Sequence, residues 1–439
     1  MKADSRSVAL EVLLRVNAGA FSDAALSRQL ELDQLDRRDS ALATLLVYGS
    51  LAWRLALDHE IKMLSDRKLS AMDAPVLEAI RLGLFQLRYL DRVPEWAAVN
   101  SSVDLARRHQ RRAAGMVNAV LRRAIRQGPP ALPDAARVGA AARLSLEYSH
   151  PQWLVQAWLD QLGEDETVAL LAANNTAAPT VLRCLLPREQ ALAELTARGV
   201  EATAAPYAPD ALLALNTGDW SGIAVSQGEA SQLVVLYLDP RPGQRVLDAC
   251  AAPGGKTAYA ACLAGQGPGG QNGHVIAVDP ARGARSRVAS TLEASGQDNV
   301  EFHACSLQQL DTDDDFDAVL VDAPCSGLGT LRQNPEIRWR RQPSDLADLA
   351  ARQAELLQLA AECVAPGGVL VYSTCTLVDA ENDAVVDRFL AENDDFTEPV
   401  ANDEAAACLQ PLLDARGRLR TFPHLHGCDG FFAARLRRR

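Results

Sequence analysis

The sequence lacks the long apolar runs and the leader segment that direct chains into or across membranes. None of its uninterrupted apolar stretches approaches the roughly twenty residues that a helix needs to span a bilayer. The N-terminus, MKADSRSVAL, has no apolar core of the kind found in secretory signals. With a hydrophobic content of 48% over 439 residues, these absences predict a globular, cytoplasmic protein of two or three domains without a membrane partner.

The nine cysteines show no pairing pattern. They form no Cys-x-x-Cys pair and have no spacing to histidine that suits zinc, so we expect no structural metal. In a reducing compartment most of them should be free thiols that pack as small apolar side chains. Two of them, Cys325 and Cys375, directly follow predicted strands and are candidates for chemistry. The cysteines lie at positions 184, 250, 262, 305, 325, 363, 375, 408 and 428.

Lysine is scarce, and one lysine has a distinctive setting. Lys256 is the only lysine after Lys68, in a chain that uses arginine for almost every other positive charge. It lies in DACAAPGGKT, residues 248–257, which close a predicted apolar strand and open a helix. A lone lysine in a glycine-rich turn between strand and helix favours a role in chemistry. A solvated surface lysine is the alternative.

The formal net charge of −12 argues against a nucleic-acid partner for the molecule as a whole. The charge is unevenly distributed, however. Residues 1–130 hold 20 Lys and Arg against 15 Asp and Glu, whereas the remaining residues hold 24 against 41. The N-terminal part is therefore net positive and suits a polyanion.

Residues 1–130 form the first predicted domain, which is all-α. Apolar residues recur at three- and four-residue spacing through residues 5–126. The segment GPPALP, residues 128–133, ends this helical region because proline cannot continue a helix. The last helices are basic, and arginine pairs phosphate bidentately, so this face suits RNA; a solvated amphipathic surface is the alternative. The arginines are Arg107, Arg108, Arg111, Arg112, Arg122, Arg123 and Arg126.

Two further domains are predicted. Residues 131–226 combine a linker with a small α+β module, with helices at 153–162 and 188–198 and a strand at 180–185. Residues 227–439 alternate buried strands with helices, which is typical of a doubly wound, Rossmann-like α/β sheet. Its strands are expected at 245–250, 274–279, 300–303, 317–322 and 368–373, its helices at 257–263, 281–295, 344–364 and 379–391, and loops at 265–273 and 311–317.

The glycine-rich turn differs from two well-known phosphate-binding signatures. A P-loop needs glycine at the position of Cys250, and the Gly-x-Gly-x-x-Gly fingerprint is absent. Because ligands in such sheets bind at the carboxyl ends of the strands, the turn favours a nucleoside cofactor without a large phosphate group. Asp279 ends the second strand, where a carboxylate can accept hydrogen bonds from both ribose hydroxyls; a helix N-cap before Pro280 is the alternative. An adenosine carrying a cationic sulfonium would suit this acidic pocket.

Two thiols and a carboxylate are expected at the same edge of the sheet. The fourth strand closes with DAPCSGLG, which places Asp322 and Cys325 there, and the fifth closes with STCT, which adds Cys375. Two free thiols beside a carboxylate favour covalent catalysis. A disulfide or redox pair is the alternative.

Four segments resemble motifs of the RsmB/Nop2/NSUN family of RNA (cytosine-5) methyltransferases, which use S-adenosyl-L-methionine. They are DACAAPGGKT, VDAPCSGLGT, STCTLVDAEN and the terminal DGFFAARL. The helical N-terminal region, with LVYGSLAWR, IRLGLFQLRYL and GMVNAVLRRA, resembles the NusB-like RNA-binding domain that RsmB-type members carry. This resemblance covers nearly the whole chain. It implies that the substrate is a single-stranded or loop region of 16S rRNA, that the middle module binds RNA, and that the protein is a monomer.

The resemblance also implies a role for each site residue. Cys375 would attack C6 of cytosine as a thiolate, Asp322 would stabilise the developing enamine, and C5 would then take the methyl group. Cys325 would help to remove the C5 proton so that Cys375 is released. Lys256 would lie near this centre, either lowering a thiol pKa or holding the substrate. The implied cofactor-binding residues are Cys250, Ala251, Ala252, Pro253, Gly254, Gly255, Lys256, Asp279 and Asp322.

The sequence departs from the family in one place. Members often carry an acidic residue after the third strand to hold the adenine amine, whereas this chain offers Ala304, Cys305 or Ser306. Two other functions stay open. One is a cytosine-5 methyltransferase of tRNA or 23S rRNA, against which the NusB-like region weighs. The other is a non-catalytic ribosome-assembly factor that binds RNA, which the presence of all four catalytic candidates disfavours.

Overall fold

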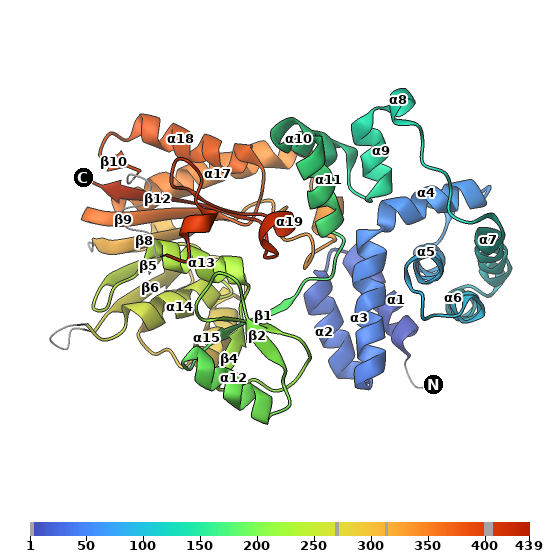
Figure 1. Cartoon of the computed structure of the whole chain (residues 1–439), viewed down its shortest axis with the longest axis horizontal. Helices are drawn as coiled ribbons and strands as arrows, with labels where there is room; N and C mark the ends of the chain where they lie inside the picture. The colour runs from blue at the N-terminus through green and yellow to red at the C-terminus, as the bar shows by residue number, and fades with distance from the viewer. Residues whose placement is uncertain (1–3, 268–271, 312–314, 399–406) are drawn as a thin grey trace. The chain divides into compact units, whose positions relative to one another are not determined.

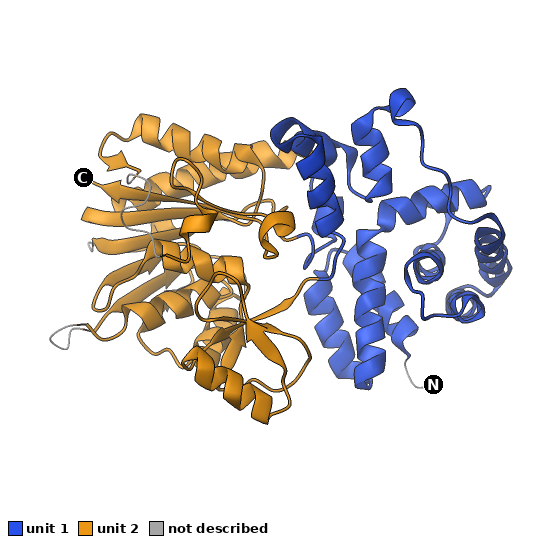
Figure 2. Ribbon diagram, viewed as in Figure 1, with its two compact units in different colours: residues 1–177, 331–341 blue, residues 178–330, 342–439 orange. Residues whose placement is uncertain are grey.

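The chain divides into two compact units, each described separately (Figure 2). Unit 1 comprises residues 1–177 and 331–341, and unit 2 comprises residues 178–330 and 342–439. This division is coarser than the three predicted domains, whose boundaries at residues 130 and 226 stay predictions. The computed structural model describes residues 4–267, 272–311, 315–398 and 407–439.

Unit 1 is built from helices, as predicted for residues 5–126 (Figure 1). Helices α1 to α7 share one apolar core, because residues three and four apart lie on the same helix face. In α1, for example, Val8, Val12 and Val16 are buried. Helix α7 ends at Gln127, directly before the predicted linker. The helices are α1 Ser5–Asn17, α2 Ser22–Asp33, α3 Arg37–Ala52, α4 Arg54–Leu64, α5 Ala74–Tyr89, α6 Glu95–His109, α7 Ala114–Gln127, α8 Ala135–Val138, α9 Ala140–Glu147, α10 Gln152–Leu162 and α11 Glu164–Ala173.

A segment from far along the chain completes unit 1. Residues 331–341 belong to this unit, although the chain on either side of them belongs to unit 2. The segment contains the short helix α16, Ile337–Arg340. Ser22 donates hydrogen bonds to the carboxylate of Glu336 from its backbone N–H, at 2.9 Å, and from its hydroxyl, at 2.8 Å. The indole N–H of Trp339 donates to the carbonyl oxygen of Leu51 at 2.6 Å.

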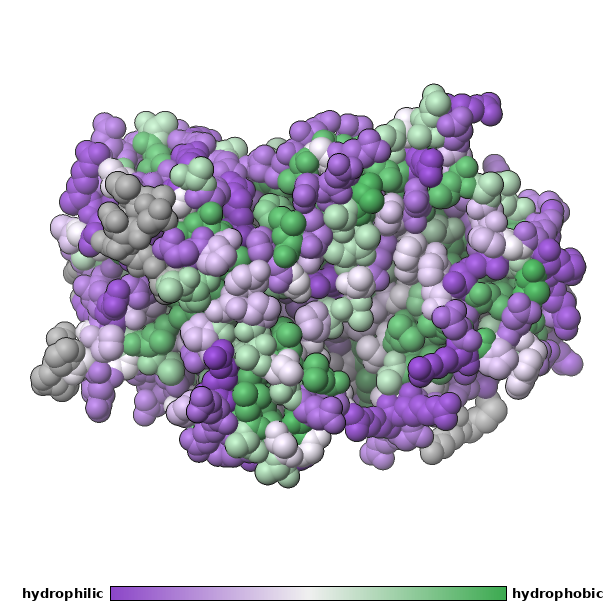
Figure 3. All heavy atoms as spheres, viewed as in Figure 1, coloured by the Kyte–Doolittle hydropathy of each residue, from purple (hydrophilic) through white to green (hydrophobic). Residues whose placement is uncertain are grey.

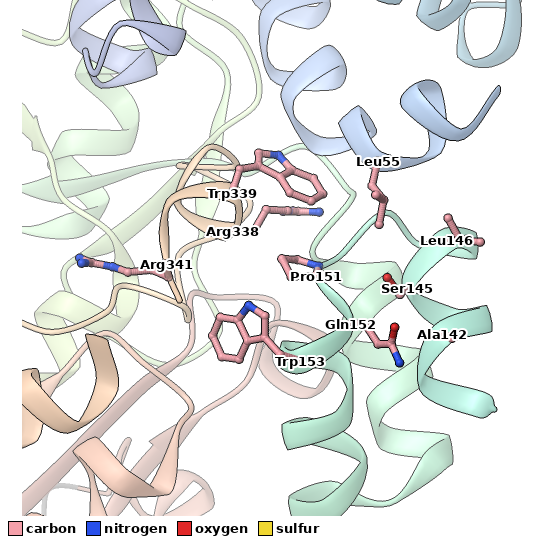
Figure 4. Close-up of a pocket in the computed structure, with 10 residues that line it drawn as sticks. All are labelled: Leu55, Ala142, Ser145, Leu146, Pro151, Gln152, Trp153, Arg338, Trp339 and Arg341. Atoms are coloured by element: carbon pink, nitrogen blue, oxygen red, sulfur yellow. The ribbon is translucent and has the colours of Figure 1, made fainter. Parts of the chain in front are cut away.

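Arg338 is the fully buried centre of this segment, and it lines a cavity of about 540 Å³ (Figure 4). Its guanidinium donates to the carbonyl oxygens of Ala52, Ser149 and Asn174 at 3.2 to 3.4 Å, and to Oδ1 of Asn175 at 2.8 Å. Helices α3 and α11 end at two of these carbonyls, where the peptide groups carry partial negative charge. Burial lowers the pKa of Arg338 to about 9, so the side chain is a cation at neutral pH. It therefore joins the ends of several helices of unit 1.

Unit 2 contains a small antiparallel sheet in the order β2-β3-β1-β4. Helix α12, Arg188–Ala197, packs on it around a separate apolar core. The predicted strand at 180–185 and helix at 188–198 are confirmed. The strands are β1 Thr180–Cys184, β2 Ala202–Ala204, β3 Ala211–Ala214 and β4 Ala224–Ser226.

The main sheet of unit 2 has the order β10-β12-β9-β8-β5-β6-β7, and β11 pairs with β12. Strands β5 to β9 are parallel, and β12 runs antiparallel to β9, so the sheet is mixed. The five predicted strands are confirmed as β5 to β9. The strands are β5 Arg245–Asp248, β6 His274–Val278, β7 Val300–His303, β8 Phe316–Asp322, β9 Val364–Thr374, β10 Phe396–Thr397, β11 Leu419–Thr421 and β12 Phe431–Arg438.

Helices cover both faces of this sheet (Figure 1). Alternate residues of a strand point to opposite faces. Accordingly Leu320 of β8 packs in the core shared with α13 and α14, while Val319 packs in the core shared with α17 and α18. The chain reverses direction across the sheet between β5 and β8, which is where doubly wound sheets bind ligands. The helices are α13 Glu229–Leu238, α14 Gly255–Ala264, α15 Ala284–Ser295, α17 Pro343–Glu362, α18 Asp383–Glu392 and α19 Pro423–His426.

Two predicted loops fall partly outside the described residues. Residues 268–271 of the glycine-rich stretch and residues 312–314 of the acidic run are not described. At the edges of the first stretch, Gln266 and Asn272 form an isolated antiparallel bridge.

Within the described residues, no single helix is long and apolar enough to cross a membrane. Helices α3 and α4, bent by 75° relative to each other, meet the length and composition criteria only as a pair.

His150 is a buried titratable group of unit 1 and is fully inaccessible to solvent. Its Nδ1 forms a hydrogen bond of 2.7 Å with the carbonyl oxygen of Tyr148. Its Nε2 is buried and has no hydrogen-bond partner in the described part of the chain. Burial lowers the pKa of His150 well below its ordinary value, and the charge of Arg338 lowers this pKa further. The folded protein therefore holds this histidine in its neutral form.

Unit 1 should lose stability in mild acid. Because the folded-state pKa of His150 lies below the ordinary value of 6.5, its contribution is fully present above that value and is lost as the pH falls toward the folded-state pKa. The loss should approach about 1.4 kcal/mol per pH unit. We expect His150→Gln, which cannot be protonated, to flatten the dependence of the unfolding midpoint on pH between 7 and 5. His109→Gln, at an exposed histidine of the same unit, is the control, and equal slopes in wild type and His150→Gln would contradict the prediction.

Candidate active site

The candidate site lies at the carboxyl edge of the main sheet, where β8 and β9 end side by side. Asp322 and Ser373 are paired across these parallel strands, and the two chains then turn away into loops. Cys325 and Cys375 lie on these two loops, and their Sγ atoms are 3.3 Å apart. Both are free, half-buried thiols. The structure thus brings together the two cysteines that the sequence pattern assigns to one edge.

Lys256 and Asp322 form a partly buried ion pair beside these thiols. The Nζ atom of Lys256 lies 2.7 Å from Oδ2 of Asp322, and the hydroxyl of Ser373 donates to Oδ1 at 2.8 Å. Burial alone would lower the pKa of Lys256, but the negative charge of Asp322 outweighs it, and the pKa is raised. The Lys256 side chain is only 13% exposed, so the alternative of a solvated surface lysine is wrong.

Asp248 stabilises the glycine-rich turn through hydrogen bonds to both of its ends. This side chain is 1% exposed and accepts hydrogen bonds from the Thr257 hydroxyl, at 2.7 Å, and the Cys250 N–H, at 3.3 Å. Burial raises the pKa of Asp248 to about 6, although the Thr257 hydrogen bond opposes this change. Gly254 has a φ of +107°, and a Cβ there would lie 3.2 Å from the backbone of Val288 in α15. The turn therefore needs glycine both for its conformation and for close packing.

Asp279 follows β6 and holds the same turn from the side. Its two carboxylate oxygens accept hydrogen bonds from the N–H groups of Ala252, at 2.9 Å, and Ala281, at 2.8 Å. The N-cap of α15 is Gly283, so the alternative role of Asp279 as that helix's N-cap is wrong. Each carboxylate oxygen accepts one of these bonds and keeps further acceptor capacity for a ligand hydroxyl.

The edge that contains these groups has a negative electrostatic potential. Asp248, Asp279 and Asp322 place three carboxylates there. Burial raises the pKa of the Cys250 thiol well above its ordinary value, and the charges of these carboxylates raise this pKa further. Lys256 balances one of the three carboxylates directly. A positively charged ligand therefore fits this turn. The candidate residues from Cys250 to Gly255 form the turn and the start of α14, whose first N–H groups have no partners within the helix.

The segment after β7 contains no acidic side chain at the positions named in the sequence. Ala304, Cys305 and Ser306 lead into a short 3-10 helix, at whose start the hydroxyl of Ser306 and the side chain of Gln309 cap each other's backbone. Cys305 packs partly against the core shared with α17.

Glu381 is a site residue that the sequence pattern did not single out. It is fully buried, and its Oε2 accepts hydrogen bonds from the N–H of Ser326, at 2.8 Å, and from the side chain of Gln353, at 2.9 Å. Gln353 also donates to the carbonyl oxygen of Pro324 at 3.0 Å. These contacts hold both residues that flank Cys325. An acidic residue inside STCTLVDAEN was the available signal, but nothing in its local sequence distinguishes it from a solvated carboxylate.

The terminal motif DGFFAARL also reaches the site. The N–H of Gly329 donates to the carbonyl oxygen of Cys375 at 2.9 Å, and the N–H of Gly430 donates to that of Gly329 at 2.8 Å. A Cβ on Gly329 would lie 1.9 Å from the Gly430 oxygen, so only glycine fits. The Nζ atom of Lys256 lies 5.2 Å from the centre of the Phe431 ring. Three loops that are distant in sequence thus interlock around the thiols.

The two thiols differ in their electrostatic setting. The hydrogen bond with Cys375 raises the pKa of Cys325 well above its ordinary value, and burial and the charge of Glu381 raise it further. Cys325 therefore keeps its proton at neutral pH and can donate it in a hydrogen bond to the Cys375 sulfur. The ammonium of Lys256 interacts electrostatically with Cys375.

The doubly wound sheet, its glycine-rich turn and the adjoining thiols define an α/β methyltransferase. Three family models match the chain: "16S rRNA methyltransferase RsmB/F" over residues 235–437, "NusB family" over residues 3–126, and a ferredoxin-like domain of RsmF/B-like methyltransferases over residues 150–219. Ribosomal RNA small subunit methyltransferase B of Thermus thermophilus is 35% identical and that of Pseudomonas putida 34% identical to this chain, over 99% and 98% of it. These matches cover 97% and 98% of the two relatives. The chain belongs to the RsmB/F family of 16S rRNA methyltransferases that carry an N-terminal NusB domain.

Two solved structures share the fold. The crystal structure of PH0851 matches with a TM-score of 0.83 at 24% identity, covering 99% of both chains. The structure of NSun6 from Pyrococcus horikoshii with SFG matches with a TM-score of 0.56 at 20% identity, covering 66% of this chain and 98% of that one. The second match leaves about a third of this chain uncovered.

Removing the Cys375 thiol should make Cys325 easier to ionise, because the largest cause of its raised pKa disappears. In Cys375→Ala, the pH at which Cys325 becomes reactive should therefore fall. The measurement is the pH dependence of alkylation by iodoacetamide, resolved by mass spectrometry of the Cys325 peptide. The peptide of Cys262, an exposed cysteine, serves as the control in the same digest. An unchanged Cys325 profile would contradict the described interaction.

Glu381 should act as a positioning residue. Glu381→Ala leaves the Ser326 N–H and the Gln353 side chain without their acceptor, so the Cys325 loop should shift and kcat for methyl transfer should fall by up to about a hundredfold. Glu381→Gln keeps an acceptor oxygen and should retain most of the activity. The KM for rRNA should stay close to the wild-type value in both variants. Equal kcat values for the alanine and glutamine variants would argue against positioning through hydrogen bonds.

Proposed function

We propose that this methyltransferase modifies C5 of a specific cytosine in 16S rRNA, with S-adenosyl-L-methionine as the methyl donor and Cys375 as the covalent nucleophile. The observation that carries the proposal is the approach of the Cys325 and Cys375 sulfurs to 3.3 Å beside the Lys256–Asp322 ion pair. A single methyl transfer to an oxygen or nitrogen atom would not need two thiols. Cytosine C5 needs them because it is a weak nucleophile until a group adds across the 5,6 double bond.

The negative edge of the sheet suits the cationic donor. Asp279 would bind the ribose hydroxyls through its remaining acceptor capacity, and the turn from Cys250 to Gly255 would surround the rest of the donor. The N–H groups at the start of α14 would bind its carboxylate. When bound, the donor supplies an electrophilic methyl group. The SFG complex of the related NSun6 structure supports a ligand site on this fold.

Cys375 is the better nucleophile of the two thiols. Cys325 keeps its proton, so it can stabilise a Cys375 thiolate by donating a hydrogen bond across the 3.3 Å separation. The Lys256 ammonium adds a favourable charge. The Cys375 thiolate forms a bond with C6 of the base, and the electron pair of the 5,6 double bond moves toward N3 and makes C5 nucleophilic.

Asp322 and Lys256 would act together on the polar edge of the base. Asp322 already accepts hydrogen bonds from Lys256 and Ser373, which fix the orientation of its carboxylate. It would accept a hydrogen bond from the exocyclic amine, and the proton shared in its ion pair would stabilise the charge that develops at N3. Lys256 thereby holds Asp322 and contributes to the electrostatics of the reaction.

Cys325 changes role once Cys375 is bonded to carbon. The adduct removes the thiolate charge and the hydrogen bond that raise the pKa of Cys325, so this thiol can then lose its proton to solvent and serve as a base. It takes the proton from C5, the electron pair of that C–H bond restores the 5,6 double bond, and the bond between C6 and Cys375 breaks with its electrons returning to sulfur. This sequence requires the target base to be unstacked, which favours a single-stranded or loop region of the RNA.

The two cysteines should be separable by mutation. Cys375→Ala should abolish methyl transfer to 16S rRNA, since no adduct forms. Cys325→Ala should form the adduct but fail to release it, leaving protein bound to RNA on denaturing gels. The measurements are tritium transfer from labelled S-adenosyl-L-methionine and gel analysis of the RNA complex.

Cys363→Ala is the matched control because this free, half-buried cysteine lies directly before β9, at the opposite end of that strand from Cys375, and it should retain activity. Bisulfite sequencing of the product identifies the modified base and the RNA species, which also tests tRNA and 23S rRNA as substrates. An active Cys375→Ala enzyme would exclude the assigned nucleophile. Failure to bind S-adenosyl-L-methionine in calorimetry would favour a non-catalytic assembly factor.

A further inference from the structure

Trp96 is unusually accessible for a tryptophan. It is 69% exposed, whereas the other five of the six tryptophans are buried or half-buried. It lies in the first turn of α6, directly after Glu95. An exposed indole costs solvation free energy in water, so its position suggests contact with another molecule.

Trp96 lines a groove of about 420 Å³ between α6 and α7 of unit 1. Val99 and Ile125 supply the apolar part of the lining, and Arg122 and Arg126 supply two cationic side chains from α7. Helices α6 and α7 pack against each other directly, as Figure 1 shows. In the face drawn in Figure 3, hydrophilic residues surround smaller apolar areas over this part of unit 1.

The two arginines are available to an anion. Arg122 uses only Nε, which donates to Oδ1 of Asn118 at 2.9 Å. Arg126 forms no hydrogen bond or ion pair with another residue in the described ranges, and neither arginine is paired with a carboxylate there. Arg88 of the same unit, by contrast, is paired with Glu60. Guanidinium groups without carboxylate partners that line the same groove as an exposed indole suit a nucleic-acid backbone and base.

We propose that this groove binds one unstacked base of single-stranded RNA. The base stacks on the Trp96 indole, Arg122 and Arg126 contact the phosphates on either side of it, and the carboxylate of Glu95 accepts a hydrogen bond from an exocyclic amine. Cytosine and adenine carry such an amine, whereas uracil does not, so the groove should disfavour uracil. The inference needs an RNA substrate but does not depend on cytosine-5 chemistry or on Cys375.

RNA fits this groove better than a protein partner. Unit 1 carries the positive part of the chain's charge, with 20 Lys and Arg against 15 Asp and Glu in residues 1–130. An aromatic ring and two arginines that line one groove, without carboxylate partners in the described ranges, suit stacked bases with flanking phosphates. A docked peptide would instead call for a larger apolar lining.

The test uses the full-length protein and fluorescein-labelled 12-nucleotide RNAs, oligo-C and oligo-U, with binding measured by fluorescence anisotropy. Trp96→Leu should weaken binding of oligo-C by about tenfold, whereas Trp96→Phe should stay close to wild type because it keeps an aromatic ring. Arg122→Gln and Arg126→Gln should each reduce the slope of log Kd against log salt concentration by about 0.7. Glu95→Leu should remove the preference for oligo-C over oligo-U.

Arg28→Gln, at an exposed arginine of α2 in the same unit, is the matched control and should change the slope less. An equal change in Arg28→Gln would indicate a general basic surface and overturn the proposal. Unchanged affinity of Trp96→Leu for oligo-C would also overturn the proposal, and it would leave a protein partner as the alternative occupant of the groove. RNA binding is measured without methyl donor, so loss of the proposed cytosine chemistry would leave this result unaffected.

Discussion

The parallel pairing of β8 with β9 is the constraint on which the site depends. Because Asp322 and Ser373 are register partners, the loops that follow these strands begin side by side. This places the sulfur atoms of the two cysteines on these loops 3.3 Å apart. Interlocking glycines then leave these loops little freedom to separate. Gly329 accepts no side chain, since a Cβ would collide with the backbone of Gly430.

Charge placement divides this edge into two functional halves. Around the glycine-rich turn, Asp248 and Asp279 make the environment suitable for a cation. Beside the thiols, Lys256 neutralises Asp322 and influences Cys375. This distribution of charge suits the cationic donor and the Cys375 thiolate of the proposed reaction.

Much of this arrangement could be predicted from the sequence because it follows from local rules. Strands that run parallel end at one edge, so Asp322, Cys325 and Cys375 could be assigned to the same place. The burial of Glu381 could not be predicted. Its carboxylate is held by hydrogen bonds from Ser326 and Gln353, and these residues come close to it only in the folded structure. The antiparallel β12 was likewise missed as a strand, because its apolar run shows neither direction nor partner. The position of residues 331–341 in unit 1 could not be predicted either. It depends on contacts such as the hydrogen bond from Arg338 to Ala52, which are 286 positions apart in the sequence, and no local pattern encodes such a contact.

The origin of that last segment has a consequence for how the chain is made. The N-terminal part of a chain emerges from the ribosome first, and N-terminal domains generally fold first. Unit 1, however, lacks the cation that joins the ends of α3 and α11 until residue 338 has emerged, by which time β5 to β8 have also been synthesised. Until then, the carbonyl groups at the ends of α3 and α11 lack this hydrogen-bond donor, while much of the main sheet is translated. The two units should therefore complete their folding together rather than one after the other.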